Sequence, residues 1–340
     1  MRRAFEISGI IVLVGIVSGS VILSFPGIVA WHAQQEKQQT ASTMQEQFPV
    51  TVDPKNKTII EDVAVNAFLE SPHSPLQAAA INAENAVWSV LEWIASAIAE
   101  ASWYQSVAAV AGVDSRIVTI TPGMRKEQVA KTFAKTLAWD AAQAKEFTTA
   151  TASSSLPLPE GSFVPGTYPV NKKMTPLAVQ ALVNERFSEE ILSHYGPETA
   201  AVVPLDQALT IASLLEREAG GADDIRIISG IIWNRLFIGM RLQIDATVQY
   251  AKANNASVAS WWPKIAPGDI FRKSPYNTYL HPGLPPTPIA NPSVAAVLAA
   301  LNPKQTPCLF YFHDNAGQFH CTETYPEHVA LLKKYFGRGK

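Results

Sequence analysis

Two glutamates near the end of a predicted helix differ in the surface that each would occupy. An apolar stripe at helical spacing precedes them, formed by Ile211, Leu214 and Leu215. The next position of that stripe is Glu218, whereas Glu216 would point to roughly the opposite face. The two acids are therefore not equivalent, and Glu218 is the one placed beside apolar side chains.

Glu218 also has the features expected of a general acid. It falls in the last helical turn, just before Gly220 and Gly221, which predict the end of the helix. Burial beside apolar groups and the negative end of the helix dipole both raise the pKa of a carboxyl group. A carboxylic acid protonated near neutral pH can protonate a glycosidic oxygen. Alternatively, Glu218 reaches solvent or pairs with Arg226.

Further polar side chains follow within the segment MRLQIDATVQY. Gln243 and Asp245 alternate with apolar residues, as in a strand that places its polar groups on one face. Asp245 is equally suited to cap a helix that starts at Ala246. Gln243 and Asp245 are our candidates for hydrogen bonds to a substrate, with turn formation and helix capping as the alternative role.

A proline-rich stretch over residues 274–293 predicts a long ordered loop. Its six prolines exclude a regular element, and long loops in compact domains are usually functional. Tyr276 and Tyr279 offer aromatic faces, and Asn277 and Thr278 offer hydrogen bonds. Of these, Tyr276, Asn277 and Thr278 are our further substrate-binding candidates, unless the loop only covers the core.

Several classes of function are disfavoured by what the chain lacks. No second acid is placed as clearly as Glu218, although hydrolases of glycosidic bonds use two carboxylates. There is no HExxH, GxSxG or zinc-type cysteine spacing, so we expect neither a metal nor a cofactor. A net charge of −2 provides no basic field for nucleic acid.

Four segments together resemble the endolytic lytic transglycosylases of the MltG (YceG-like) family, in the family's order. They are ASLLEREA at 212–219, IWNRLFIGMRLQIDATVQY at 232–250, SPYNTYLHPGLPPTPIANPS at 274–293 and TETYPEHV at 322–329. The resemblance covers roughly residues 160–336, with weaker similarity from about 116. By position in the motif, the family's catalytic glutamate corresponds to Glu218. One departure is Ala246, where the family usually has proline.

The resemblance implies a reaction on peptidoglycan. Glu218 would protonate the oxygen between MurNAc and GlcNAc and then accept the proton of the MurNAc C6 hydroxyl, which closes a 1,6-anhydro ring and ends strand elongation. The five candidates above would hold sugar hydroxyl and acetamido groups, and peptidoglycan synthases would be partners. The alternatives are an inverting hydrolase with Asp245 as the base for water, and a glycan-binding scaffold without catalysis.

The N-terminus predicts a membrane anchor. Residues 7–31 contain no charged side chain, and this segment is long enough to span a bilayer. Arg2 and Arg3 precede it. The positive-inside rule then places the remainder outside the cytoplasm, so we expect a single-pass protein of the inner (cytoplasmic) membrane with an extracytoplasmic catalytic domain. A cleavable signal peptide is the alternative, since IVAWHA has small residues at a suitable spacing.

The expected fold class is α+β, with a small βα subdomain before an α+β catalytic domain. Residues 116–137 predict a strand, a turn at Pro122 and Gly123, and an amphipathic helix, which resembles half of a LysM unit. The expected organisation is a cytoplasmic tail (1–6), a transmembrane helix (7–31), a polar linker and Ala-rich helical segment (32–112), a LysM-like subdomain (113–160) and a YceG-like catalytic domain (161–340).

Both cysteines lie in CLFYFHDNAGQFHC, which predicts a β-hairpin. A two-residue turn at Asp314 and Asn315 would place Cys308 and Cys321 directly opposite, and a turn one residue later would offset them by one pair. A disulfide persists outside the cytoplasm, so the pair is either bridged or two buried free thiols.

Overall fold

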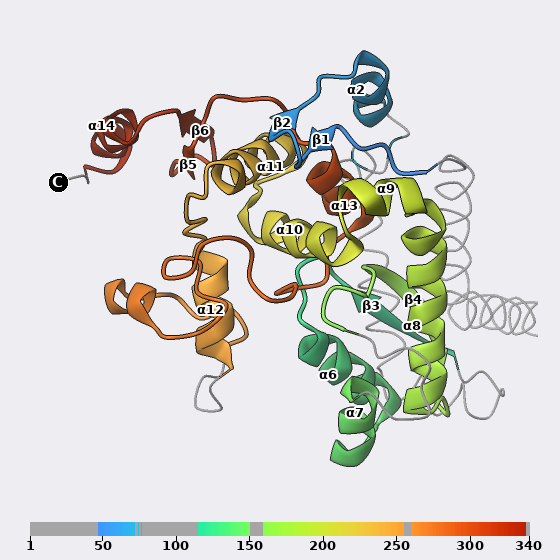
Figure 1. Ribbon diagram of the computed structural model, residues 1–340. Helices are drawn as coiled ribbons and strands as arrows, with labels where there is room; N and C mark the ends of the chain where they lie inside the picture. The colour runs from blue at the N-terminus through green and yellow to red at the C-terminus, as the bar shows by residue number, and fades with distance from the viewer. Residues whose placement is uncertain are drawn as a thin grey trace, which may run out of the picture.

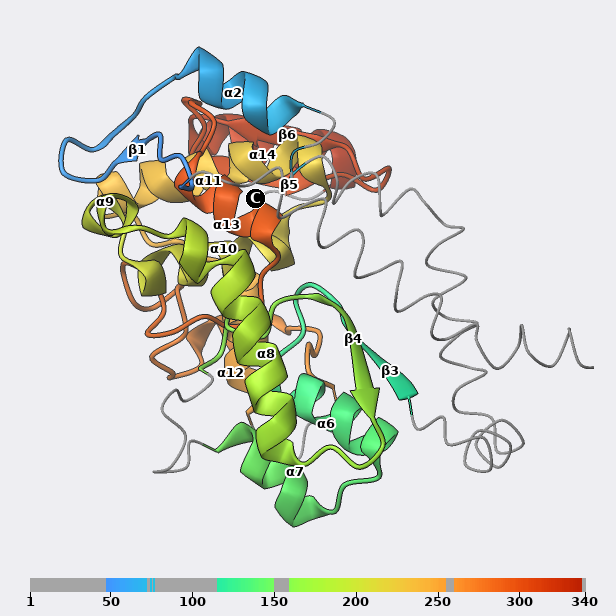
Figure 2. The same ribbon diagram turned by 90° about the vertical axis from the view of Figure 1, so that its right-hand side faces the viewer.

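The computed structural model describes residues 47–71, 74, 76, 115–149, 159–254 and 260–337 (Figures 1 and 2). These residues form a mixed α+β structure that is mostly helical, with three small two-stranded antiparallel sheets. The α+β class predicted from the sequence is confirmed. The segment expected to anchor the chain, 7–31, lies outside the described residues. Within them, no helix combines the length and the apolar character that crossing a membrane requires.

The stretch from residue 47 packs on the main core rather than forming part of a linker. It contains β1 (Val52–Asp53), β2 (Thr58–Ile59) and α2 (Val63–Glu70), and Asp62 caps α2 by accepting two backbone N–H groups. Phe48 is only 4% exposed and belongs to the main core. Residues 47–60, which fall within the stretch expected as linker and helical segment (32–112), thus contact the core through a few apolar side chains such as Phe48 and Val52.

Two helices and two paired strands form a separate unit. β3 (Ser115–Ile120) pairs antiparallel with β4 (Gly166–Asn171), and α6 (Lys126–Leu137) and α7 (Ala141–Thr148) lie between them in the chain. This unit has its own core, which includes Val118, Ile120, Val129, Phe133, Phe147, Phe163 and Tyr168. The strand, turn and helix predicted for residues 116–137 are confirmed. A LysM-like role and the domain limits stay predictions.

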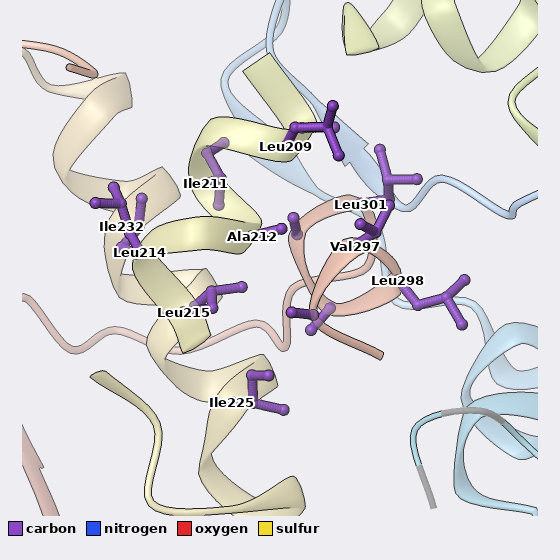
Figure 3. Packing of buried hydrophobic residues seen from close by; sticks show 14 of the residues in the cluster. Leu209, Ile211, Ala212, Leu214, Leu215, Ile225, Ile232, Val297, Leu298 and Leu301 are labelled. Carbon is purple, nitrogen blue, oxygen red and sulfur yellow. The ribbon is translucent and has the colours of Figure 1, made fainter. Parts of the chain in front are cut away.

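The main core forms around α10 (Leu205–Glu218), which packs on α11 (Ala222–Phe237) and α13 (Val294–Leu301) (Figure 3). Every residue of α13 after Val294 is buried, as expected for a helix that is apolar on all sides. The chain reaches α10 through α8 (Pro176–Glu190), η1 (Leu192–His194) and α9 (Pro197–Val202). Helix α10 begins at Leu205, directly after Pro204.

Two peripheral elements lie on one side of α10, to its left in Figure 1. One is α12 (Asp245–Ala253), followed by η2 (Pro267–Phe271) and the proline-rich loop. The other is the hairpin of β5 (Phe310–His313) and β6 (Phe319–Thr322), followed by α14 (Tyr325–Phe336). The residues of the candidate site come from α10, α12, the loop and β5.

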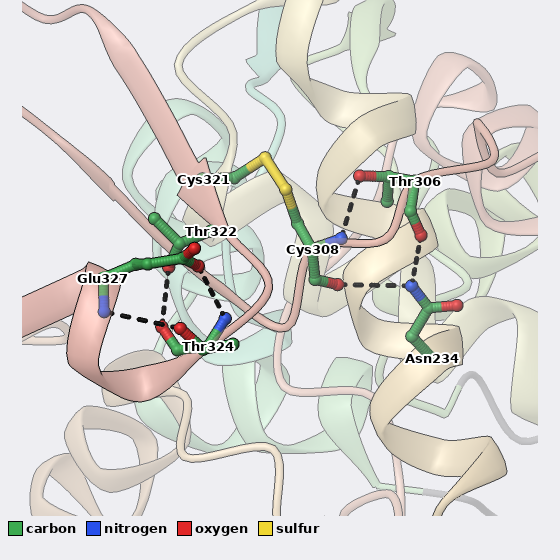
Figure 4. The surroundings of a disulfide bond; sticks show 7 residues. All are labelled: Asn234, Thr306, Cys308, Cys321, Thr322, Thr324 and Glu327. Carbon is green, nitrogen blue, oxygen red and sulfur yellow. Dashed lines mark hydrogen bonds between the residues drawn. A yellow bond between two sulfur atoms is a disulfide. The ribbon is translucent and has the colours of Figure 1, made fainter.

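The hairpin carries a disulfide bond between Cys308 and Cys321 (Figure 4). Its register differs from both registers considered from the sequence, because Phe310 pairs with Thr322 and the backbone N–H of Asp314 donates to the carbonyl of Gln318, which leaves three residues in the turn. Asp314 stabilises the turn by accepting the backbone N–H groups of Ala316 and Gln318. The bridge therefore runs diagonally across the hairpin rather than between opposite residues.

Candidate active site

Glu218 is the last residue of α10, and the stripe before it is buried as predicted. Ile211, Leu214 and Leu215 are each 0% exposed, whereas Glu218 is partly buried. The helix ends there because Ala219 adopts an extended conformation. The acid thus lies where the apolar core meets the loops around α12 and β5.

The surroundings of Glu218 suit a group that both donates and accepts a proton. Burial raises the pKa of Glu218 to about 7, and the nearby carboxylate of Asp245 adds to the rise. Tyr311 donates its hydroxyl to Oε2 of Glu218 over 2.8 Å, which lowers the pKa, as do the backbone N–H of Ala246 and the charge of Arg217. Near neutral pH, Glu218 therefore populates both protonation states, which general acid and base catalysis by one group requires.

Glu216 contacts a different element from Glu218, so the two acids are not equivalent. Its Oε1 accepts the hydroxyl of Ser293 and the backbone N–H of the same residue, the latter over 2.8 Å. Ser293 caps α13, so Glu216 joins the ends of two core helices. It also lines a cavity of about 220 Å³ that Glu218 does not line. Glu216 is thus a structural carboxylate rather than a solvent-exposed one.

The turn after Glu218 is held by Asp224, the third residue of α11. Its carboxylate accepts the backbone N–H groups of Gly220 and Gly221, over 2.9 and 3.1 Å, and contacts Nε2 of His313 at 2.5 Å. Asp224 therefore bonds back to Gly221, the N-cap residue of α11. Arg226, the alternative partner considered for Glu218, instead donates to the carbonyl of Asn302.

Gln243 and Asp245 are both exposed beside the site. The alternation predicted here is confirmed, since Leu242 and Ile244 are buried at 2% and 3% exposure. The strand is not, because α12 begins at Asp245, in agreement with the alternative that a helix starts here. Tyr279 donates its hydroxyl to Oδ1 of Asp245 over 2.5 Å. Gln243 has a left-handed backbone with φ of +53°, which is uncommon outside glycine and concentrates at functional sites.

Asn277 and Thr278 are fully or almost fully buried within the predicted loop. The side-chain amide of Asn277 donates to the carbonyls of Ile270 and Arg272, and its oxygen accepts the N–H of Tyr279. Thr278 accepts the N–H of Ile244 with its hydroxyl, which connects the loop to the start of α12. In this structure both side chains contact protein groups. Their binding of substrate stays a prediction.

Tyr276 is half-buried, and its ring lies 4.8 Å from the ring of Tyr250 on α12. Its hydroxyl is 2.8 Å from that of Thr287, within the same loop. The loop is therefore ordered by its own side chains, as predicted. A further aromatic ring, that of Trp262, lies 6.5 Å from the ring of Tyr250, and the guanidinium of Arg217 stacks over it at 4.1 Å.

Tyr311 and Trp262 were missed by the sequence analysis. Tyr311 belongs to a hairpin that was considered only for its cysteines, yet strand periodicity places it on the same face as His313, which contacts Asp224. That signal was present in the sequence. Within the described ranges, no three His, Cys, Asp or Glu side chains are grouped as a metal site requires.

Comparison with protein families gives an independent result. The model of the YceG-like family matches residues 93–334. A yceG-like protein of Listeria monocytogenes, known from a crystal structure at 2.6 Å, is similar with a TM-score of 0.51 and 28% identity, over 63% of this chain and 75% of that chain.

Two curated relatives carry the name endolytic murein transglycosylase. The protein of Bacillus subtilis (strain 168) is 34% identical over 179 residues, which are 52% of this chain and 48% of the relative. That of Streptococcus pneumoniae serotype 2 is 29% identical over 158 residues, which are 46% of this chain and 28% of the relative. The chain thus matches about half or less of the length of these relatives.

Proposed function

We propose that this chain, which belongs to the YceG-like family, is an endolytic murein transglycosylase that cuts peptidoglycan and leaves 1,6-anhydroMurNAc ends. The observation that carries the proposal is Glu218, a carboxyl group at the end of a buried helix with a pKa raised to about 7. The names of the relatives support peptidoglycan as the substrate.

In the proposed reaction Glu218 acts twice. Protonated Glu218 first gives its proton to the oxygen between MurNAc C1 and GlcNAc, which leaves as an alcohol. The resulting carboxylate then takes the proton of the MurNAc C6 hydroxyl while O6 bonds to C1. No water is consumed, and Glu218 returns to its protonated form. A pKa near the working pH suits both steps.

The neighbouring residues have proposed roles that follow from their positions. Tyr276 presents a ring for a sugar face, and exposed Gln243 and Asp245 offer hydrogen bonds to hydroxyl and acetamido groups. Asn277 and Thr278 were also expected to form hydrogen bonds with the sugar. Their side chains bond to protein groups, which supports a role in ordering the loop rather than in binding sugar directly.

An inverting hydrolase is the second candidate, because Asp245 is a second carboxylate close enough to raise the pKa of Glu218. It would act as the base for an attacking water while Glu218 acts as the acid. The hydroxyl of Tyr279 donates a hydrogen bond to Oδ1 of Asp245, which holds this carboxylate in place. The two reactions differ in their products, because hydrolysis adds one water to the cut strand.

The cellular setting is also proposed. The uncharged span over 7–31 supports a single-pass anchor in the cytoplasmic membrane, with the catalytic residues on the outer side and synthases of nascent strands as partners. The Cys308–Cys321 bridge supports an extracytoplasmic location, because disulfides are rare in the cytosol.

The mass of the products is the decisive test. Full-length protein in detergent is incubated with uncrosslinked peptidoglycan strands, and the new ends are identified by mass spectrometry. We expect 1,6-anhydroMurNAc at internal cut sites. Reducing MurNAc ends, heavier by one water, would replace the proposal with the hydrolase. No cleavage by wild-type protein that binds the strands would favour a glycan-binding scaffold.

A further inference from the structure

The β5–β6 hairpin presents two different faces to the rest of the protein. On one face, Tyr311 bonds to Glu218 and His313 bonds to Asp224. On the other face, Phe310 and Phe312 pack against aromatic side chains of α14. The hairpin thus lies between α14 and the end of α10, with its polar face towards the candidate acid.

The two polar contacts fix the last residue of α10 and the turn that follows it. Tyr311 contacts the last residue of the helix, and His313 contacts the carboxylate that holds the next turn, at Gly220 and Gly221. A movement of β5 would therefore change the position of Glu218 and of the turn after it.

The hairpin itself is small and depends on attachments near its open end. Only four residue pairs join β5 to β6, and isolated two-stranded hairpins are marginally stable in water. Arg235 donates from Nε to the carbonyl of Leu309 over 2.7 Å, and Asn234 donates to the carbonyl of Cys308 over 3.2 Å. The Cys308–Cys321 bridge joins this anchored segment to β6 (Figure 4).

We infer that Tyr311 is a positioning residue that orients Glu218 for proton transfer, and that the Cys308–Cys321 bridge acts on turnover by fixing Tyr311. The catalytic role of Glu218 in this inference rests on the proposed function. The effect of Tyr311 on the pKa of Glu218 does not rest on the proposed function, because that pKa can be measured without turnover.

The pH response distinguishes positioning from simple support of the fold. The Tyr311 hydrogen bond lowers the pKa of Glu218, so its removal raises that pKa and moves the alkaline limb of kcat/KM to higher pH. The other titratable or charged groups that act on Glu218 stay in place; they are Asp245 on α12, Arg217 on α10, Arg235 on α11 and Tyr279 in the loop.

The first experiment compares Tyr311→Phe with Tyr325→Phe, a matched control whose tyrosine is 60% exposed on α14. We expect Tyr311→Phe to lower kcat by about 10- to 100-fold, the effect of losing a hydrogen bond to a charged group, with little change in KM. The alkaline limb should move to higher pH, and the control should match wild type. A lower kcat with an unmoved limb would overturn the inference.

A second readout does not need catalysis. Full-length protein carrying glutamate labelled with ¹³C at the carboxyl carbon is titrated by NMR, and the Glu218 resonance is identified as the one absent from Glu218→Gln. The titration midpoint should be higher in Tyr311→Phe than in wild type. An unchanged midpoint overturns the inference, whether or not the protein cleaves peptidoglycan.

The third experiment tests the bridge through a double-mutant cycle. Cys308→Ala with Cys321→Ala should lower kcat, and adding Tyr311→Phe to that pair should cost much less than it costs in wild type. Equal losses in both backgrounds would show that the bridge does not act through Tyr311. If the alanine pair does not fold, wild-type protein reduced by dithiothreitol replaces it, with loss of the bridge confirmed by intact mass after alkylation.

Discussion

Replacing Glu218 by glutamine should separate the chemistry of this residue from its contribution to the fold. The amide of Glu218→Gln keeps the size of the side chain and an oxygen that accepts the Tyr311 hydroxyl, but it cannot transfer a proton. Loss of general acid catalysis lowers turnover by about 10²- to 10⁴-fold, and the loss is larger when one group serves both steps. We expect no 1,6-anhydro ends above background.

The stability of the same variant follows from the raised pKa. Folding moves the pKa of Glu218 from 4.5 to about 7, so the folded state holds the proton more tightly than the unfolded state does. The contribution of Glu218 to the free energy of unfolding is therefore greatest below pH 4.5. It falls as the pH rises to about 7 and is constant above that pH. At about 1.4 kcal/mol for each pH unit, the loss at pH 8 is at most about 3.5 kcal/mol. Glutamine removes this loss.

The assay measures urea unfolding and strand cleavage for wild type, Glu218→Gln and the matched control Glu216→Gln. Burial raises the pKa of Glu216 as well, and glutamine there still offers an oxygen to Ser293. The control should therefore cleave as wild type does, although its position differs by only two residues. Glu218→Gln should be more stable than wild type at pH 8 and equal to it near pH 4.5. Full activity in Glu218→Gln, or equal losses in both variants, would refute the assignment.

Three further outcomes are expected. Asp245→Asn removes a charge that raises the pKa of Glu218, so the alkaline limb of kcat/KM should move to lower pH while products keep 1,6-anhydro ends. A fall in kcat/KM of about 100-fold or more at every pH would instead favour Asp245 as a base. Asn291→Ala should lower the free energy of unfolding by about 3 kcal/mol or more, since this buried side chain makes four hydrogen bonds to distant residues. Urea titration measures this free energy, and a change of less than about 1 kcal/mol would contradict a role of Asn291 in linking these segments. A periplasm-active reporter fused after Lys340 should be active while the protein stays membrane-bound; release of a soluble form would indicate a cleaved signal peptide.

Local patterns in the sequence were sufficient to predict α10, its apolar stripe and the position of Glu218 at the end of that stripe. Helical spacing places Glu218 next to Ile211, Leu214 and Leu215 on one face whatever packs against it, and all three apolar residues are buried. The proline-rich loop was predicted for the same reason, because six prolines exclude any regular element.

Contacts between distant residues could not be predicted in this way. Tyr311 lies 93 residues from Glu218, and Glu216 lies 77 residues from Ser293. Sequence spacing alone describes Glu216 as an outward-facing acid, because helical periodicity says nothing about which helix end will meet that face. The substrate candidates show the same limit, since only the tertiary structure reveals that the side-chain amide of Asn277 donates to the carbonyls of Ile270 and Arg272, just before the loop.

The sequence by itself determined the helix face on which Glu218 lies, because that face depends only on neighbouring residues. The tertiary structure decided how that acid is tuned, because a pKa depends on burial and on charges brought close by folding. The three groups that act most on Glu218 besides its burial are Tyr311, Asp245 and Ala246, and all come from other elements. The hairpin register was decided in the same way, since the three-residue turn depends on the bonds that Asp314 makes with the backbone rather than on the spacing of the two cysteines.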